Sequence, residues 1–240
     1  MRRKFARSSP LERVAIASLI LAACASEQAE VGSDPPRDAG PSMSDGAPPA
    51  GEASTGSEAG SGRCDALAPL RLYYWNLRTA ATSTDVNYIV KVENATGAPI
   101  ALSSLEIRYY LTNELPTGST IDVFYTDTCC SNKQTDFKDS IVTAVRSFGA
   151  KPSADAYLQI AFAPAVGALA AGDAVQVEIG FHDAGYVRSS TQTNDYSFSA
   201  AAGGTQAQWN DCPGAQCETK FTSCAMTVHK DGVLVWGALP

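Results

Sequence analysis

Hydrophobic and polar residues alternate, or form short apolar runs, over most of the chain after residue 69. These segments are rich in Val, Ile and Tyr and are separated by Gly, Pro, Asp and Asn residues. A period of two and short apolar runs bounded by turn residues predict β-strands, and no stretch has a convincing helical period. The predicted strands are residues 70–75, 86–94, 105–112, 121–125, 141–148, 156–163, 174–181, 225–229 and 233–237.

A tight turn joins the last two predicted strands. Asp231-Gly232 lies between them, and Asp-Gly is preferred in two-residue hairpin turns because both central residues need positive φ. About nine or ten strands in residues 64–240 predict an all-β fold, with a β-sandwich as the architecture. The pattern alone does not distinguish a jelly-roll from other sandwich topologies.

The first 23 residues have a different pattern. Basic residues come first, and residues 14–23 (VAIASLILAA) form an apolar run too short to span a bilayer. We interpret residues 1–23 as a secretory signal peptide. Its end, Leu-Ala-Ala followed by Cys24, resembles the lipobox of bacterial lipoproteins, in which the cysteine carries lipid; the alternative is an ordinary signal with a chance cysteine. Ala25 after Cys24 favours an outer-membrane lipoprotein.

Residues 25–62 contain no Leu, Ile, Phe, Tyr or Trp and are mostly Gly, Ser, Ala, Pro, Asp and Glu. Such a segment cannot bury enough apolar surface to fold. With Cys24 and Arg63 it forms the predicted tether, residues 24–63, between a lipid anchor and the domain at residues 64–240. The net charge of the chain, −7, argues against nucleic acid and anionic lipid as ligands and allows a neutral one.

Six cysteines remain in the predicted domain. An even number in an exported domain predicts disulfides, with the connectivity left open. A zinc site is the alternative, but paired C-x2-C motifs are missing. The disulfide candidates are Cys64, Cys129, Cys130, Cys212, Cys217 and Cys224.

Motifs of common catalytic centres are absent from the sequence. It has two histidines, His182 and His229, and no G-x-S-x-G, H-E-x-x-H or glycine-rich phosphate loop. We expect His229, in a predicted hairpin strand, to be exposed. Two carboxylates could still converge in space for glycoside hydrolysis, but nothing in the sequence selects a pair. The prediction is a protein that is not an enzyme.

Five segments, LRLYYWNLRTAATSTDVNYIVKVEN, SSLEIRYYLTNE, ADAYLQIAF, TQTNDYSF and DGVLVWG, resemble in order and spacing the family 3 carbohydrate-binding modules of cellulases and cellulosome scaffolds. The resemblance covers residues 70–240. It implies a nine-stranded jelly-roll β-sandwich with a structural calcium, and binding of polysaccharide without catalysis.

The resemblance also assigns the calcium ligands. They fall in two segments about 80 residues apart, and calcium takes six to eight oxygen ligands of the kinds found there. The family usually has Asp where this chain has Glu114. The alternative is that TQTND is a loop that satisfies its own backbone. The implied metal ligands are Thr112, Glu114, Thr191, Asn194 and Asp195.

The family's flat cellulose-binding strip is poorly matched. Its Asp is kept as Asp127, but Thr128 stands at the His position, and the Tyr position falls near Phe137 in a gapped stretch. Phe181 and Val187 stand at the Arg and Trp positions, with Tyr186 beside Val187; Phe181 is alternatively a core residue. The candidate carbohydrate-binding residues are Asp127, Thr128, Phe137 and Tyr186.

A shallow groove on the opposite face of the family is better matched, either as a binding groove or as a structural polar cluster. Its candidate residues are Arg108, Tyr110, Tyr157 and Tyr196. The segment after Trp209 is longer than in the family, and we hypothesise that its cysteines bond to Cys129 or Cys130. We therefore expect a membrane-anchored module that binds cellulose or a related β-glucan. The alternative is a structural or protein-interaction module that has lost this affinity.

Overall fold

The structure is a computed structural model that describes residues 64–65, 67–115, 118–129, 134–210, 212–213, 218 and 220–240, without the side chains of Cys129, Gln134 and Thr135. The predicted signal peptide, Cys24 and the tether lie outside the described residues. Cys130 and Cys217 also lie outside them.

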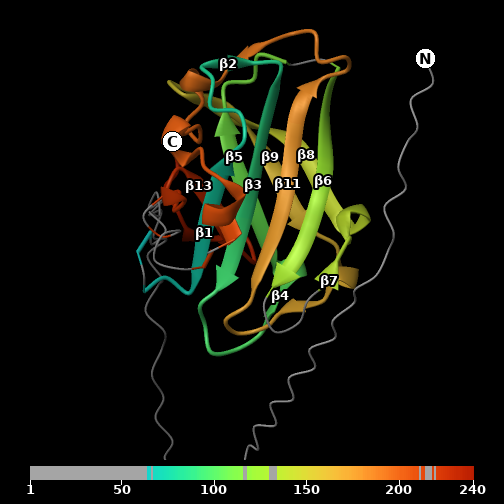
Figure 1. The fold of residues 1–240 in the computed structure, drawn as a ribbon, viewed down its shortest axis with the longest axis vertical. Helices are drawn as coiled ribbons and strands as arrows, with labels where there is room; N and C mark the ends of the chain where they lie inside the picture. The colour runs from blue at the N-terminus through green and yellow to red at the C-terminus, as the bar shows by residue number, and fades with distance from the viewer. Residues whose placement is uncertain are drawn as a thin grey trace, which may run out of the picture. The chain divides into compact units, whose positions relative to one another are not determined.

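Two five-stranded antiparallel sheets form the domain (Figure 1). The first has the order β1-β3-β11-β6-β7 and the second β14-β13-β5-β9-β8. The strands of the first sheet are β1 (Leu70–Asn76), β3 (Asp85–Asn94), β6 (Ser119–Cys129), β7 (Gln134–Thr135) and β11 (Ala174–Asp183). Those of the second are β5 (Leu105–Leu111), β8 (Ile141–Lys151), β9 (Ala154–Phe162), β13 (Met226–Lys230) and β14 (Val233–Trp236).

The remaining elements are short. Two-residue pairs join β4 (Ile100–Ala101) to β10 (Ala168–Leu169) and β2 (Thr82–Ser83) to β12 (Ser190–Thr191). The helical segments are α1 (Gln206–Asn210) and the 3-10 turns Leu102–Ser104, Lys138–Ser140, Pro164–Val166, Gln192–Asn194 and Ala200–Ala202. Within the described part of the chain, no helix has the length and apolar character needed to span a membrane.

The predicted all-β sandwich is confirmed. In the described residues nine strands have four or more residues, and each corresponds to one of the nine predicted segments. The chain crosses between the sheets from β3 to β5, β5 to β6, β6 to β8, β9 to β11 and β11 to β13. Such repeated crossing between two packed sheets is the jelly-roll arrangement.

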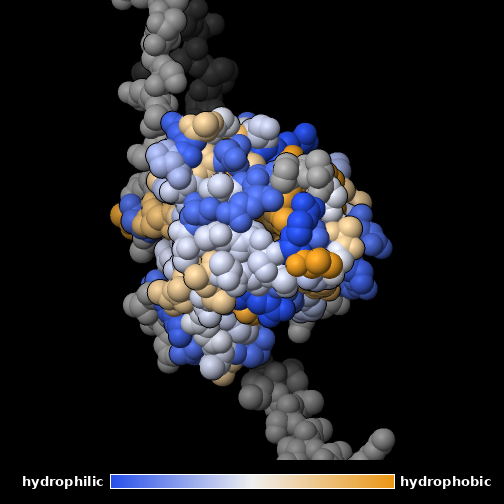
Figure 2. All heavy atoms as spheres, turned by 90° about the horizontal axis from the view of Figure 1, so that it is seen from above, coloured by the Kyte–Doolittle hydropathy of each residue, from blue (hydrophilic) through white to orange (hydrophobic). Residues whose placement is uncertain are grey.

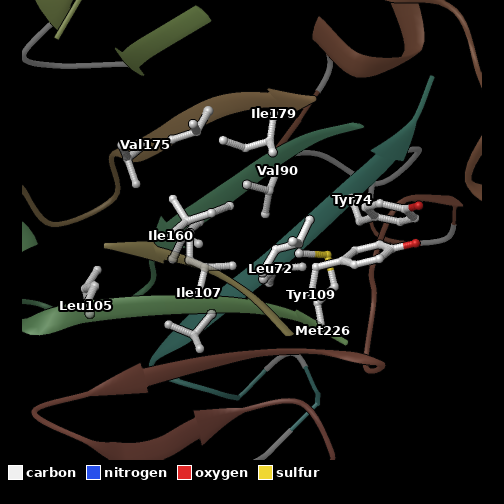
Figure 3. Close-up of a cluster of buried hydrophobic side chains, with 14 of the residues drawn as sticks. Leu72, Tyr74, Val90, Leu105, Ile107, Tyr109, Ile160, Val175, Ile179 and Met226 are labelled. Atoms are coloured by element: carbon white, nitrogen blue, oxygen red, sulfur yellow. The ribbon is translucent and has the colours of Figure 1, made fainter. Parts of the chain in front are cut away.

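The core lies between the sheets and follows from the period of two. Alternate residues of each strand point inward, so Val90 and Ile179 of the first sheet face Ile107 and Ile160 of the second (Figure 3). The rings of Tyr88 and Tyr109 stack across the core with centroids 4.9 Å apart. Full burial of each such aliphatic side chain contributes about 1.5–3 kcal/mol, so the two inner faces hold the sheets together.

A second hydrophobic cluster lies on the outer face of β1 and β3. Residues after the 3-10 turn Ala200–Ala202 return across these strands (Figure 1). We call residues 203–225 the inserted segment, because they contain the connection after Trp209 that is predicted to be longer than in the family. Trp209 and Phe221 of this segment pack against Trp75, with ring centroids 5.8 and 6.4 Å away. The members of the cluster are Tyr73, Trp75, Ile89, Trp209, Cys212 and Phe221.

A disulfide ties the inserted segment to the domain. Cys224 is bonded to Cys64, across 160 residues of sequence, and Cys212 is also disulfide-bonded. Cys224 is therefore not the partner of Cys129 or Cys130, and that part of the hypothesis is wrong. A bond from Cys129 or Cys130 to the remaining cysteines of the segment stays a prediction.

One end of the sandwich is shown in Figure 2. Hydrophilic and intermediate residues cover most of it, and hydrophobic residues form only small groups. This end therefore lacks the broad apolar patch that marks many protein-binding surfaces.

Candidate functional site

A β-bulge in β6 places two consecutive aromatic side chains on the same face. Tyr125 is opposite Glu178 of β11, but Val123 is opposite Ile179, so Phe124 is the extra residue. A bulge of this kind re-aims side chains at the point where the register shifts. Phe124 and Tyr125 are 44% and 41% exposed on the outer face of the first sheet.

The Phe124 ring lies over Gly180, which has no side chain to obstruct it. A Cβ atom at Gly180 would lie 2.5 Å from the Phe124 ring, which is far inside van der Waals contact. The ring therefore covers the backbone of β11 at the one position where no side chain stands in the way. Gly180 is on the outer face because its neighbours Ile179 and Phe181 point into the core.

Tyr186 lies on the same face, at the end of β11. Its φ of 55° is in the left-handed region, which is uncommon for a residue other than glycine. The ring stacks on His182, with centroids 3.7 Å apart and planes 14° from parallel. Its hydroxyl donates to Asp122 over 3.4 Å, and the residue is 44% exposed.

The surroundings of His182 favour its positively charged form. Its Nδ1 lies 2.7 Å from the carbonyl oxygen of Asp183, and its Nε2 lies 2.8 Å from Oδ2 of Asp122. Both oxygens are acceptors, so both ring nitrogens must donate, and only the imidazolium does this. Burial opposes the charge, but these two hydrogen bonds outweigh it and raise the pKa of His182 above its ordinary value.

Phe124, Tyr125 and Tyr186 together form what we call the aromatic row. Among the described residues, these three are the exposed aromatic side chains. They are associated with Gly180, Glu178 and His182, alternate residues on the outer face of β11, and alternate residues of a strand are spaced about 6–7 Å apart. Exposed rings in a row can stack on the apolar faces of successive sugar units.

Of the four candidate carbohydrate-binding residues, two lie on this outer face. Tyr186 belongs to the aromatic row, and Asp127 lies beside it, accepting a hydrogen bond from the Tyr125 hydroxyl over 3.0 Å. The prediction that Thr128 contacts carbohydrate is wrong, because this residue is buried opposite Val175, which faces the core. Phe137 is also wrong, since it is 6% exposed and packs in the core.

The predicted metal ligands converge from two distant segments. The Thr112 N–H donates to Oδ1 of Asp195 over 2.8 Å, and the Thr112 hydroxyl donates to the carbonyl oxygen of Asn194 over 3.1 Å. Glu114 accepts from the Thr191 N–H over 2.8 Å and from Nδ2 of Asn194 over 2.9 Å. All five residues are thus joined in one network.

Two groups of this network, the Asn194 side-chain oxygen and the Asp195 carboxyl, have properties that suit a cation ligand. Oδ1 of Asn194 is buried without a hydrogen-bond partner. Asp195 is buried, and that burial, together with the nearby Glu114 and Asp155, raises its pKa to about 8 although the Thr112 N–H opposes the shift. The candidate ligand atoms of these side chains are all oxygens, which hard cations such as calcium prefer. No group of three or more His, Cys, Asp or Glu side chains in the described part could hold a metal ion by itself.

The predicted shallow-groove residues also lie together, but one of them is inaccessible. Arg108 lies 4.7 Å above the Tyr157 ring and is paired with Glu106. Tyr110 is fully buried beneath Tyr157 and Tyr196, with its hydroxyl 3.0 Å from that of Thr227. The prediction that Tyr110 contacts a ligand is therefore wrong. The remaining groove residues contact one another or Tyr110, which favours a structural cluster over a binding groove.

His229 is also buried, which contradicts the expectation of an exposed residue. Its Nε2 lies 3.2 Å from the Thr227 hydroxyl. Burial, assisted by Arg108, lowers the pKa of His229, so this histidine is neutral near pH 7 and differs from His182.

The family profile described as "Cellulose binding domain" matches residues 72–237. The chain belongs to the family 3 carbohydrate-binding modules. This is a family of non-catalytic binding modules, which agrees with the absence of catalytic motifs in the sequence.

Known relatives share the module rather than their full length. The chain is 30% identical over 177 residues to a xyloglucanase of a Paenibacillus species, covering 71% of this chain and 14% of the relative. It is 29% identical over 176 residues to cellulosomal-scaffolding protein A of Acetivibrio thermocellus, covering 71% and 8%. A solved family IIIa cellulose-binding domain from Clostridium cellulolyticum aligns with a TM-score of 0.61 at 22% identity, covering 72% of this chain and 98% of that one.

Sequence reasoning missed Phe124, Tyr125 and Asp122. All three lie within or beside the predicted strand 121–125, where strict alternation would place Phe124 and Tyr125 on opposite faces. The adjacent aromatic pair was the available signal, because a bulge is needed if both rings are to face solvent.

The charge on His182 predicts a pH dependence of stability. Its pKa is raised in the folded protein, so its contribution is complete below about pH 6.5 and is lost as pH rises through the folded pKa. We expect Asp122→Asn to destabilise the protein most at pH 6 and less at pH 9. Urea unfolding of both proteins across this range measures the difference, and a constant difference would contradict the charged imidazolium.

Proposed function

We propose that this protein binds cellulose or a related β-glucan through the aromatic row on its first sheet. The observation that carries the proposal is that all three exposed aromatic rings of the described residues gather on this one face. Membership of the cellulose binding domain family supports it, although this chain lacks most of the strip that the family resemblance implied.

Stacking and hydrogen bonding would act together on this face. The rings of Tyr125, Phe124 and Tyr186 present flat apolar surface to the C–H faces of the sugar, and aromatic contacts contribute about 0.5–1.5 kcal/mol each beyond area burial. The carboxylates of Asp122 and Asp127 lie among the rings and accept hydrogen bonds from hydroxyl groups. A neutral glucan avoids repulsion by a protein of net charge −7.

Fixed ring positions lower the cost of binding. Tyr186 is held by its stack on His182 and by Asp122, and Tyr125 is held by its hydrogen bond to Asp127. Side chains that are already ordered lose less rotamer entropy when a ligand binds.

We expect the full chain to be retained on amorphous cellulose, and Tyr186→Ala or Phe124→Ala to weaken retention roughly fivefold or more through lost stacking. Depletion isotherms measure the change. Tyr157→Ala, on the opposite face, is the control and should bind like the unaltered protein.

If no polysaccharide in a panel of crystalline cellulose, amorphous cellulose, xylan and chitin retained the protein, the structural or protein-interaction alternative would replace this proposal. If Tyr157→Ala alone reduced retention, the binding surface would be the opposite sheet.

We further propose that Thr112, Glu114, Thr191, Asn194 and Asp195 hold a calcium ion. The unpartnered Asn194 oxygen and the buried Asp195 carboxylate support this. The bound ion would supply positive charge between the two segments. The residues themselves already join the end of β5 to the turn after β12 through hydrogen bonds, so the ion would reinforce an existing contact.

Calcium should raise the melting temperature, and a chelator should reverse the increase. Asp195→Ala should abolish the difference, because it removes the buried carboxylate. Thr193→Ala is the matched control, since Thr193 is an exposed residue of the same segment. Equal melting temperatures with calcium and with chelator would show that Glu114 joins the segments without a metal.

We also propose that the protein is exported and anchored to a bacterial outer membrane by lipid on Cys24. The basic start, the apolar run and the Leu-Ala-Ala-Cys sequence support this. Expressed in a bacterium, the protein should partition with membranes, and Cys24→Ser should move it to the soluble fraction. An N-terminal peptide of unlipidated mass from the unaltered protein would contradict the anchor.

A further inference from the structure

A hollow of about 530 Å³ lies on the outer face of the first sheet, at one end of the aromatic row. Its floor comes from β3, β11 and β6, and one side comes from α1 and Cys212 of the inserted segment. The volume is in the range of small-molecule sites. Tyr125 belongs both to the aromatic row and to the lining of the hollow, so the two are continuous.

The wall of this hollow is fixed in place. Trp209 of α1 donates from Nε1 to the side-chain oxygen of Gln176 in β11 over 2.7 Å. Lys91 of β3 lies 4.7 Å from the centroid of the Trp209 ring and donates to the carbonyl oxygen of Cys212 over 2.9 Å. Together with the hydrophobic cluster beneath it, these contacts hold α1 as a raised edge beside β11.

The lining is polar and suits hydroxyl groups. Glu178 faces the hollow, and burial raises the pKa of its carboxyl. Asp127 uses one oxygen to accept from Tyr125, while the other is buried with no hydrogen-bond partner in the described part. The Asp127 carboxylate lines the hollow and can accept a hydrogen bond from a hydroxyl group of a ligand. Gln206 and Asn210 add amide groups on the opposite side.

We propose that the hollow is a subsite for a single β-glucan chain that continues from the aromatic row. This inference rests on the proposed function and narrows its ligand. The flat surface of crystalline cellulose can contact the exposed rings but cannot enter the hollow beside α1. A single glucan chain can enter it and turn its hydroxyl groups toward Asp127 and Glu178. The protein thus prefers soluble or amorphous chains over crystalline cellulose.

The test compares cellohexaose, a soluble β-1,4-glucan, with crystalline and amorphous cellulose, using the full chain. Asp127→Ala and Glu178→Ala each remove a carboxylate from the hollow. Asp139→Ala is the matched control, because Asp139 is exposed outside the hollow and the row. Thermal melting verifies that each variant is folded.

We expect calorimetry to detect cellohexaose binding that weakens about tenfold or more in the two hollow variants, as loss of a hydrogen bond to a charged group predicts, and is unchanged in Asp139→Ala. Retention on amorphous cellulose with no cellohexaose binding, or with binding that the hollow variants leave unchanged, would overturn the subsite and keep the aromatic row. Absence of binding to every glucan would overturn both proposals. Equal or stronger binding to crystalline cellulose would overturn the stated preference.

Discussion

The pairing of β6 with β11, and the register shift within it, is the constraint on which the proposed binding face depends. Without the bulge, Phe124 would point into the core, where the inward residues of β11 already fill the space. With it, Phe124 and Tyr125 share the outer face, and Gly180 leaves room for the first ring. The bulge leaves one residue of β6 out of the regular pairing, and as a result two aromatic rings are exposed on the same strand.

The inserted segment covers one part of the outer face of the first sheet and forms a raised side next to the part that stays exposed. In the family resemblance, the cellulose-binding surface is a flat strip of one sheet. Here Trp209 and Phe221 cover the outer face of β1 and β3, and the exposed part of the sheet is limited to β11 and β6 with the hollow between them and α1. The apolar cluster beneath the segment, rather than any ligand contact, accounts for its position.

Charge is placed differently on the two sides of the domain. The imidazolium form of His182 is favoured because both of its ring nitrogens face acceptors, and its ring stacks on that of Tyr186. On the other sheet His229 is neutral and Arg108 is paired with Glu106. The buried carboxyl of Asp195 has a raised pKa and lies where two segments about 80 residues apart meet, so the proposed cation site is at a junction and not at the proposed binding face.

The sequence by itself determined the strands and the sandwich, and it identified the polar residues that meet at the junction. A period of two is set by the backbone, so each buried strand shows itself in the residues, and the oxygen-bearing side chains of Thr191 to Asp195 are visible as a cluster. Only the tertiary structure decided which side chains face solvent near the bulge, that Thr128, Phe137 and Tyr110 are buried, and that α1 forms one side of a hollow. These outcomes depend on register and on contacts between segments far apart in sequence, and a one-residue shift in register reverses the face of every following side chain.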